Sequence, residues 1–280
     1  MREIHVAEIA EHVRNLCIEA NYGLSSDMRE CLARAAAEEN ASLGQQILHQ
    51  LEDNLRIAAR EQIPVCQDTG MAVVFLEIGQ DVHLTGGNIA EAVNEGVRRG
   101  YAEGYLRKSV VSDPLERINT GDNTPAVIHF AVVPGEQVKI VVAPKGFGSE
   151  NKSRLFMLTP ADGIEGVKDA VLQAVEEAGP NACPPMTVGV GIGGTFEKCA
   201  LLAKQALLVP AGRHSDIRYV REMEQELLER INEMGIGPAG LGGRTTALAV
   251  HVLTYPTHIA GLPVAVNICC HVNRHAEYVF

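Results

Sequence analysis

From residue 63 onward, short runs of β-branched and apolar residues alternate with longer runs that have helical periodicity. This alternation restricts the chain to the α/β class, because strands and helices of this kind bury their apolar sides against each other. The predicted strands are 72–76, 126–133, 138–143, 186–190, 248–253 and 264–268, and the predicted helices are 89–100, 163–177, 196–207 and 216–234. We expect a mixed α/β body over about 63–280.

The first sixty residues have a different pattern. Apolar side chains recur over 6–20 with the spacing of one helix face, a second helix is expected after the cap Ser25-Ser26-Asp27, and a third over 43–59. This part, about 1–62, is expected to form a helical N-terminal layer. No linker or internal repeat divides the sequence, so we expect one compact unit over 1–280.

Composition and charge exclude several classes of function. The formal net charge of −11 disfavours a general nucleic-acid surface, which needs a basic face. The sequence contains neither a bilayer-length apolar run nor a signal-peptide pattern at its start, and we expect a cytoplasmic location. Seven cysteines in such a chain indicate a reducing compartment, where thiols remain available for metal.

Three cysteines stand in loop-like settings rich in proline, glycine and amides: Cys66, Cys183 and Cys270. The ordinary interpretation of a cysteine is a small buried apolar residue, and it fits Cys17, Cys31 and Cys199, which fall within helical patterns. Spacing alone does not establish a metal site, since no CxxC pair is present. If the three loop thiolates converge in the fold, they can hold an iron–sulfur cluster that keeps one iron open for chemistry.

Polar residues beside these cysteines are candidates for substrate chemistry. Gln67 and Asp68 follow Cys66, and a carboxylate beside a Lewis-acid iron suits proton transfer, although 68–70 also reads as a simple turn. Arg107 can clamp a carboxylate, but surface exposure is the commoner fate of an arginine. His258, in a turn framed by proline and glycine, can bind a carboxylate or relay a proton, although a lone histidine is more often a surface residue.

Glycine-rich segments give two further signals. Lys145-Gly146-Phe147-Gly148 follows a predicted strand, where backbone N–H groups can form a nest for an anion. Gly189 to Gly194 matches GxGxxG and predicts, as a competing interpretation, a dinucleotide-binding oxidoreductase. The acidic residue that such a site needs about 20 positions later is not at the end of a second strand. A further cluster, 237–243, indicates close backbone approach.

Six blocks of this sequence together resemble one known family. They are Pro64 to Gly70, Ser109 to Pro114 with Asn119 to Pro125, Lys145 to Ser153, Cys183-Pro184-Pro185, Gly237 to Thr246 and Pro256 to Cys270. The family is the class I, iron–sulfur fumarate hydratases, which includes tartrate dehydratases. The resemblance implies a 4Fe-4S cluster held by Cys66, Cys183 and Cys270. Phe147 departs from the small residue expected in its turn.

The resemblance also implies roles for other residues and a partner. It implies catalytic roles for Asp68 and His258, and substrate contacts from the following residues: Gln67, Arg107, Lys145, Gly146 and Gly148. Family members that consist of a single chain continue into a second catalytic domain, which this sequence lacks. The chain therefore resembles the α subunit of an α2β2 enzyme that needs a β subunit. The expected reaction is the hydration of fumarate to L-malate, with L(+)-tartrate dehydration as the alternative. An iron–sulfur module without dicarboxylate affinity is a further possibility.

Overall fold

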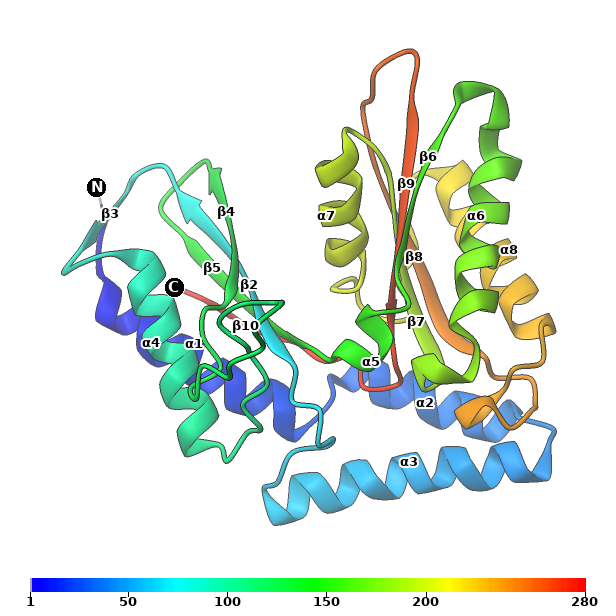
Figure 1. The fold of residues 1–280 in the computed structure, drawn as a ribbon, viewed down its shortest axis with the longest axis horizontal. Coiled ribbons are helices and arrows are strands. Elements are labelled where there is room, and N and C mark those ends of the chain that lie inside the picture. The colour runs from blue at the N-terminus through cyan, green and yellow to red at the C-terminus, as the bar shows by residue number, and fades with distance from the viewer. Residues whose placement is uncertain (1) are drawn as a thin grey trace. The chain divides into compact units, whose positions relative to one another are not determined.

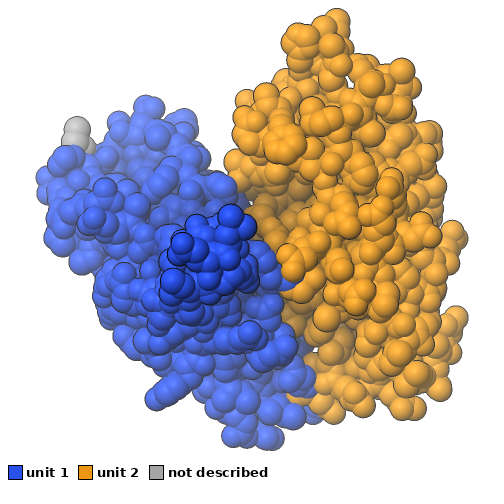
Figure 2. All heavy atoms as spheres, in the orientation of Figure 1, with its two compact units in different colours: residues 1–25, 54–147, 274–280 blue, residues 26–53, 148–273 orange. Residues whose placement is uncertain are grey.

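The computed structural model describes residues 2–280, and the chain forms two compact units (Figures 1 and 2). Unit 1 contains residues up to 25, 54–147 and 274–280, and unit 2 contains 26–53 and 148–273. The chain therefore passes from one unit to the other at four points. This division differs from the single unit with a separate helical layer that we expected, because the N-terminal helices are shared between the two units.

Unit 1 is built on a four-stranded sheet in the order β10-β5-β2-β4. Its strands are β2 (Met71–Gly79), β4 (Val127–Val133), β5 (Val138–Lys145) and β10 (Ala276–Val279). β4 pairs with β2 in parallel, whereas β5 is antiparallel to both β2 and β10. Two short strands, β1 (Arg2–His5) and β3 (Val82–Thr85), form a separate parallel pair.

Helices α1 (Val6–Tyr22) and α4 (Ile89–Glu103) pack together and share one hydrophobic core with the sheet of unit 1 (Figure 1). The apolar stripe of α1 and the side chains of Val93, Val97 and Tyr101 meet the inward residues of β2 and β5. The helical periodicity of the N-terminal sequence therefore marks a real buried face, and it supplies the cover that the sheet of unit 1 requires.

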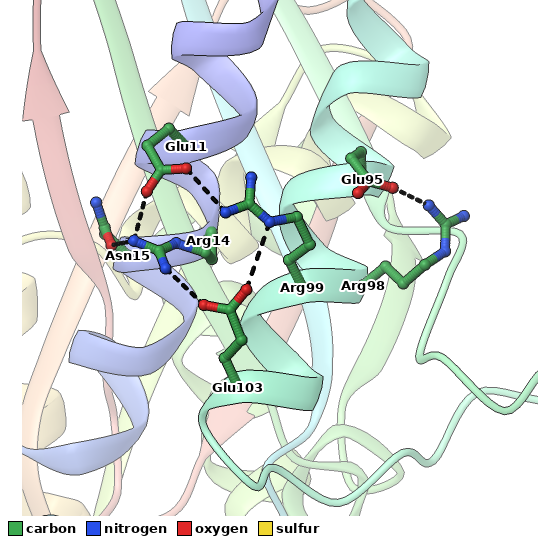
Figure 3. Close-up of polar contacts among 7 residues, drawn as sticks. All are labelled: Glu11, Arg14, Asn15, Glu95, Arg98, Arg99 and Glu103. Atoms are coloured by element: carbon green, nitrogen blue, oxygen red, sulfur yellow. Dashed lines mark hydrogen bonds and ion pairs between the residues drawn. The ribbon is translucent and has the colours of Figure 1, made fainter.

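A cluster of alternating charges joins α1 to α4 on their outer side (Figure 3). Arg14 Nη1 lies 2.5 Å from Glu103 Oε2, and Arg99 Nη2 lies 3.0 Å from Glu11 Oε2. Arg14 also pairs with Glu11, and Arg99 with Glu103, so each carboxylate meets two guanidinium groups. All four side chains keep contact with solvent, and the cluster adds a modest, salt-sensitive contribution to the apolar packing beneath it.

Unit 2 has a second four-stranded sheet, in the order β6-β9-β7-β8. Its strands are β6 (Arg154–Leu158), β7 (Met186–Gly193), β8 (Ala247–Tyr255) and β9 (Leu262–Cys269). β7 and β8 are parallel, and β9 is antiparallel to both β7 and β6. Figure 1 shows α6 (Gly163–Ala178) and α8 (Arg218–Glu233) on one face of this sheet and α7 (Phe196–Ala206) on the other, in agreement with the two apolar clusters.

The remaining helices connect these parts. They are α2 (Ser26–Glu38), α3 (Ser42–Glu61), the short α5 (Phe147–Glu150), and the 3-10 turns η1 (Pro160–Asp162), η2 (Gly179–Ala182) and η3 (Pro238–Gly240). α2 packs against β8 within unit 2, whereas residues of α3 belong to both units. Within residues 2–280, no helix combines the length and the apolar character needed to cross a bilayer.

The predicted α/β class is confirmed, and each predicted strand and helix is found with ends shifted by a few residues. β1, β3, β6 and β10 were missed. Each of these strands has only four or five residues, too few for alternation to stand out from a loop.

The GxGxxG segment is explained by packing. Gly189 and Gly191 lie inside β7, not in a turn after a strand as the dinucleotide fingerprint requires. A Cβ atom at Gly191 would lie 2.1 Å from the carbonyl oxygen of Cys199, and one at Gly189 would lie 2.2 Å from that of Ala203. Both glycines therefore allow α7 to lie directly on the strand.

Candidate functional site

In unit 1 the loop that carries Cys66 is fixed by backbone hydrogen bonds on its N-terminal side. The Val65 N–H donates to the Asn21 carbonyl at 2.9 Å, and the Asn54 amide donates to the Val65 carbonyl at 2.9 Å. The next residue, Cys66, is partly exposed, and its thiol lies 3.3 Å from Gln67 Oε1. A partly exposed thiol is thus presented to solvent from a loop that hydrogen bonds hold in place.

Asp68 is held in one orientation by two backbone donors. Its carboxylate accepts the Gly70 N–H at 3.1 Å and the Phe147 N–H at 2.9 Å. A Cβ atom at Gly146 would lie 3.0 Å from Asp68 Oδ2, so a side chain there would crowd the carboxylate. The Phe147 N–H, which we expected to be available to an anionic ligand, is therefore used by the protein's own Asp68.

Other predicted residues gather around the same loop. Gly70 has φ +72°, and its α-carbon packs so tightly against Lys145 that a Cβ atom would lie 2.6 Å from the carbonyl carbon of Lys145. Lys145 is buried at the end of β5, with its Nζ 3.3 Å from the Gly146 carbonyl. The Arg107 carbonyl accepts the Thr69 hydroxyl at 2.8 Å, while the Arg107 side chain is exposed.

Three buried side chains that we did not predict donate hydrogen bonds to backbone carbonyls of the Cys66 loop. The Tyr101 hydroxyl lies 2.7 Å from the Thr69 carbonyl oxygen, and burial raises the pKa of this phenol, which keeps it a donor. The Asn123 amide donates to the Gly70 carbonyl at 3.2 Å. Arg274, only 5% exposed, donates to the carbonyl of Asp68. Their sequence contexts carried no signal for these contacts, which join residues far apart in the chain.

In unit 2 the structure brings the loops of Cys183 and Cys270 together. The carbonyl of Cys183 accepts the His271 backbone N–H at 3.4 Å and lies 3.1 Å from His271 Nδ1, which donates to it. Cys183 is exposed and has left-handed backbone angles, φ 55° and ψ 62°. Such angles are costly for a residue with a Cβ atom and occur most often at functional sites.

The two adjacent cysteines differ in exposure. Cys269 is the last residue of β9 and is 4% exposed, whereas Cys270 is partly exposed. This difference supports Cys270 as the available thiol, because it lies just beyond the end of the buried strand β9. Cys17, Cys31 and Cys199 are buried, which confirms their expected structural role, and burial raises the pKa of the Cys17 thiol to about 12.

The glycine cluster 237–243 supports the Cys183 loop. The Ala239 N–H donates to the Pro184 carbonyl at 2.9 Å. The far end of the segment is held by Glu39, whose buried carboxylate accepts the N–H groups of Arg244 at 3.0 Å and Thr245 at 2.8 Å. Burial alone would raise the pKa of Glu39, but its backbone donors outweigh burial and lower it to about 2.

His258 does not accompany the cysteines of unit 2. It lies in the connection from β8 to β9, beyond the pair Gly193–Tyr255 in the strand register, whereas Cys183 and Cys270 lie at the other end, beyond the pair Thr187–Cys269. His258 is exposed and lines a pocket of about 410 Å³ with apolar neighbours such as Ile164, Met223 and Leu262. β8 and β9 both run past their predicted ends, which places the connection at the far end of the sheet.

The three candidate cysteines are ligands of the type that an iron–sulfur cluster requires. Within residues 2–280, no three His, Cys, Asp or Glu side chains are grouped so that they could hold a single metal ion. Cys183 and Cys270 come from adjoining loops of unit 2, and Cys66 belongs to unit 1. All three are exposed or partly exposed thiols, the ligand type that a cluster requires, and the other four cysteines are buried.

Comparison with known proteins decides the family. Residues 10–279 match the family model described as Fumarate hydratase (Fumerase). The chain belongs to the fumarate hydratase family. A protein of Methanocaldococcus jannaschii named "Putative L(+)-tartrate dehydratase subunit alpha" is 42% identical over 276 residues, which cover 96% of each chain. The L(+)-tartrate dehydratase subunit alpha of Escherichia coli strain UTI89 is 31% identical over 98% of this chain and 93% of its own length. The family resemblance drawn from the six sequence blocks is thereby confirmed.

Proposed function

We propose that this chain is the α subunit of an iron–sulfur hydro-lyase that dehydrates L(+)-tartrate together with a β subunit in an α2β2 enzyme. Both relatives described above are named as α subunits of tartrate dehydratases, and the alignments cover nearly all of each protein. Their names favour tartrate over fumarate, which was our first expectation. The observation that carries the proposal is the Asp68 carboxylate, which two backbone N–H groups hold and which lies two positions after the partly exposed Cys66 in the chain.

Dehydration of a hydroxy dicarboxylate requires loss of a proton from one carbon and of hydroxide from its neighbour. Cys66, Cys183 and Cys270 would hold the 4Fe-4S cluster, which supplies a Lewis-acid iron for the departing hydroxyl group. Asp68 is suited to accept or return a proton, because its two backbone donors leave one orientation of the carboxylate. The β subunit can supply the opposite acid or base.

The substrate carboxylates need cationic and polar partners. The exposed guanidinium of Arg107 suits bidentate binding of a carboxylate, with Gln67 as a neutral donor beside it. The Lys145 Nζ lies 3.3 Å from the Gly146 carbonyl, and Gly146 and Gly148 place no side chains in that turn. We assign no role to His258, since the sheet of unit 2 separates it from Cys183 and Cys270.

Fumarate hydration is the second candidate, because the matching family is described by that activity. Malate and tartrate differ by one hydroxyl group, so a site with a hydrogen-bonding partner for the second hydroxyl would discriminate strongly between them.

The decisive experiment is co-production with the β subunit, anaerobic reconstitution with iron and sulfide, and assay with L(+)-tartrate, D-tartrate, L-malate and fumarate. We expect L(+)-tartrate to be the preferred substrate. Serine variants of Cys66, Cys183 and Cys270 should each lose iron and turnover, whereas Cys269→Ser, the matched control, should keep both. Iron retained in all three variants, or no dicarboxylate turnover by the iron-loaded complex, would falsify the proposal.

A further inference from the structure

Arg274 is a buried cation at the Cys66 loop, and its hydrogen-bonding capacity is mostly unused. It is 5% exposed and follows Cys270 by four residues. One guanidinium nitrogen, Nη2, donates to the carbonyl of Asp68. Its Nε and Nη1 atoms are buried, and neither has a hydrogen-bond partner among residues 2–280.

Arg274 also forms no direct ion pair. Within residues 2–280, no carboxylate oxygen lies within 4.0 Å of a guanidinium nitrogen of Arg274, although the residue whose carbonyl it contacts, Asp68, carries a carboxylate. The other arginines around the α1–α4 cluster are half-exposed and each meets at least one carboxylate. Arg274 thus combines deep burial with the lack of a direct ion pair, in a chain whose formal net charge is −11.

Burying an unpaired guanidinium is costly, because the lost hydration is not replaced by an opposite charge. The contact with the Asp68 carbonyl replaces only part of that hydration. A compensating anion close to the Cys66–Asp68 loop would account for the arrangement, and that loop is already the candidate site.

We propose that Arg274 is the positioning residue that holds an anionic group at the Cys66–Asp68 loop, by supplying a buried positive charge that no carboxylate of residues 2–280 pairs with directly. It donates to the Asp68 carbonyl through Nη2, and its charge attracts an anion to the Cys66–Asp68 loop. This inference rests on the proposed function for its two sources of negative charge, the thiolate-ligated cluster and the substrate dicarboxylate.

The charge can be tested in the cluster-free chain through the selectivity of Cys66 alkylation. Iodoacetate is anionic and iodoacetamide is neutral, and the Cys66 thiolate attacks the CH2 carbon of each and displaces iodide. The ratio of the iodoacetate rate to the iodoacetamide rate at Cys66 therefore reports the local charge. Peptide mapping separates Cys66 from the other cysteines. We expect the ratio to fall about three-fold or more in Arg274→Met at low salt. It should stay near the wild-type value in Arg274→Lys, which keeps the charge.

Arg230→Met is the matched control, because Arg230 lies on α8 in unit 2, is partly exposed and pairs with Glu226 and Asp169. If Arg274→Met fails to fold, Arg274→Gln, which keeps a donor for the Asp68 carbonyl, replaces it. An unchanged ratio in the neutral variant overturns the proposal, since Arg274 would then be only a structural residue.

Two further measurements distinguish the two sources of negative charge, the cluster and the substrate. L(+)-tartrate binding to the cluster-free chain is measured by calorimetry, and iron release from the reconstituted chain is measured with a chelator. A several-fold loss of tartrate affinity in Arg274→Met identifies the substrate as the anion, and several-fold faster iron release identifies the cluster. If neither changes, the proposal is refuted even where wild-type turnover supports the function. If the wild-type complex shows no turnover, only the proposed function is refuted, because the alkylation ratio does not depend on turnover.

Discussion

The buried carboxylate of Glu39 should be one of the strongest single contributors to the stability of unit 2. It accepts four backbone N–H groups, from Asn40, Ala41, Arg244 and Thr245, at 2.8–3.0 Å. These donors lower its pKa from the ordinary 4.5 to about 2. At about 1.36 kcal/mol for each pKa unit, the ionised carboxylate contributes about 3 kcal/mol at neutral pH.

The test is Glu39→Gln, which keeps the shape of the side chain but removes its charge. Because the folded-state pKa is depressed, the stabilisation is complete above about pH 5 and is lost as the pH falls from 4.5 towards 2. At pH 7 the variant should melt about 6–12 °C below the wild type. Glu38→Gln, which removes the neighbouring exposed carboxylate, is the matched control and should melt like the wild type.

The same variant should loosen the Cys183 loop, because Glu39 anchors the segment that donates to the Pro184 carbonyl. Faster alkylation of Cys183, with Cys66 unchanged, would report this effect. A melting temperature of Glu39→Gln within about 2 °C of that of Glu38→Gln would show that the four hydrogen bonds do not carry the stability we assign to them.

Three further outcomes follow from packing and charge. His251 is buried, and its burial lowers its pKa from 6.5 to about 4, so the chain should lose about 2 kcal/mol of stability between pH 7 and pH 5; His251→Gln should remove this slope in urea titrations. Gly191→Ala should cost about 3 kcal/mol or prevent folding, since its Cβ atom would meet the α7 backbone, whereas Gly23→Ala, into open space, should melt like the wild type. Arg14→Met should cost about 1 kcal/mol at low salt and less in concentrated salt, because its ion pairs are exposed; a salt-independent loss would contradict this.

The sequence predicted the helices and strands better than the division of the chain into two compact units. The predicted strands and helices were found because their periodicity is local. The division into two units was not predicted, because two of the four crossings, at 53–54 and 147–148, fall inside α3 and α5. Continuous helical sequence at these points contains none of the signals of a linker.

The contacts that organise the candidate site are mostly long-range. Arg274 reaches the Asp68 carbonyl across 206 positions, and Phe147 reaches the Asp68 carboxylate across 79. Neither pairing leaves a trace in local composition. For His258, the register of β7, β8 and β9 places the residue beyond the opposite end of the sheet from Cys270, and its catalytic role stays a prediction.

The position of β10 has a consequence for biosynthesis. This strand closes the sheet of unit 1 by pairing Ala276–Val279 with β5, although all of unit 2 precedes it in the chain and is complete by residue 273. During translation, the β5 edge therefore waits unpaired while the whole of unit 2 emerges from the ribosome. Ribosome-bound chains arrested before residue 276 should accordingly expose that edge to chaperones and proteases.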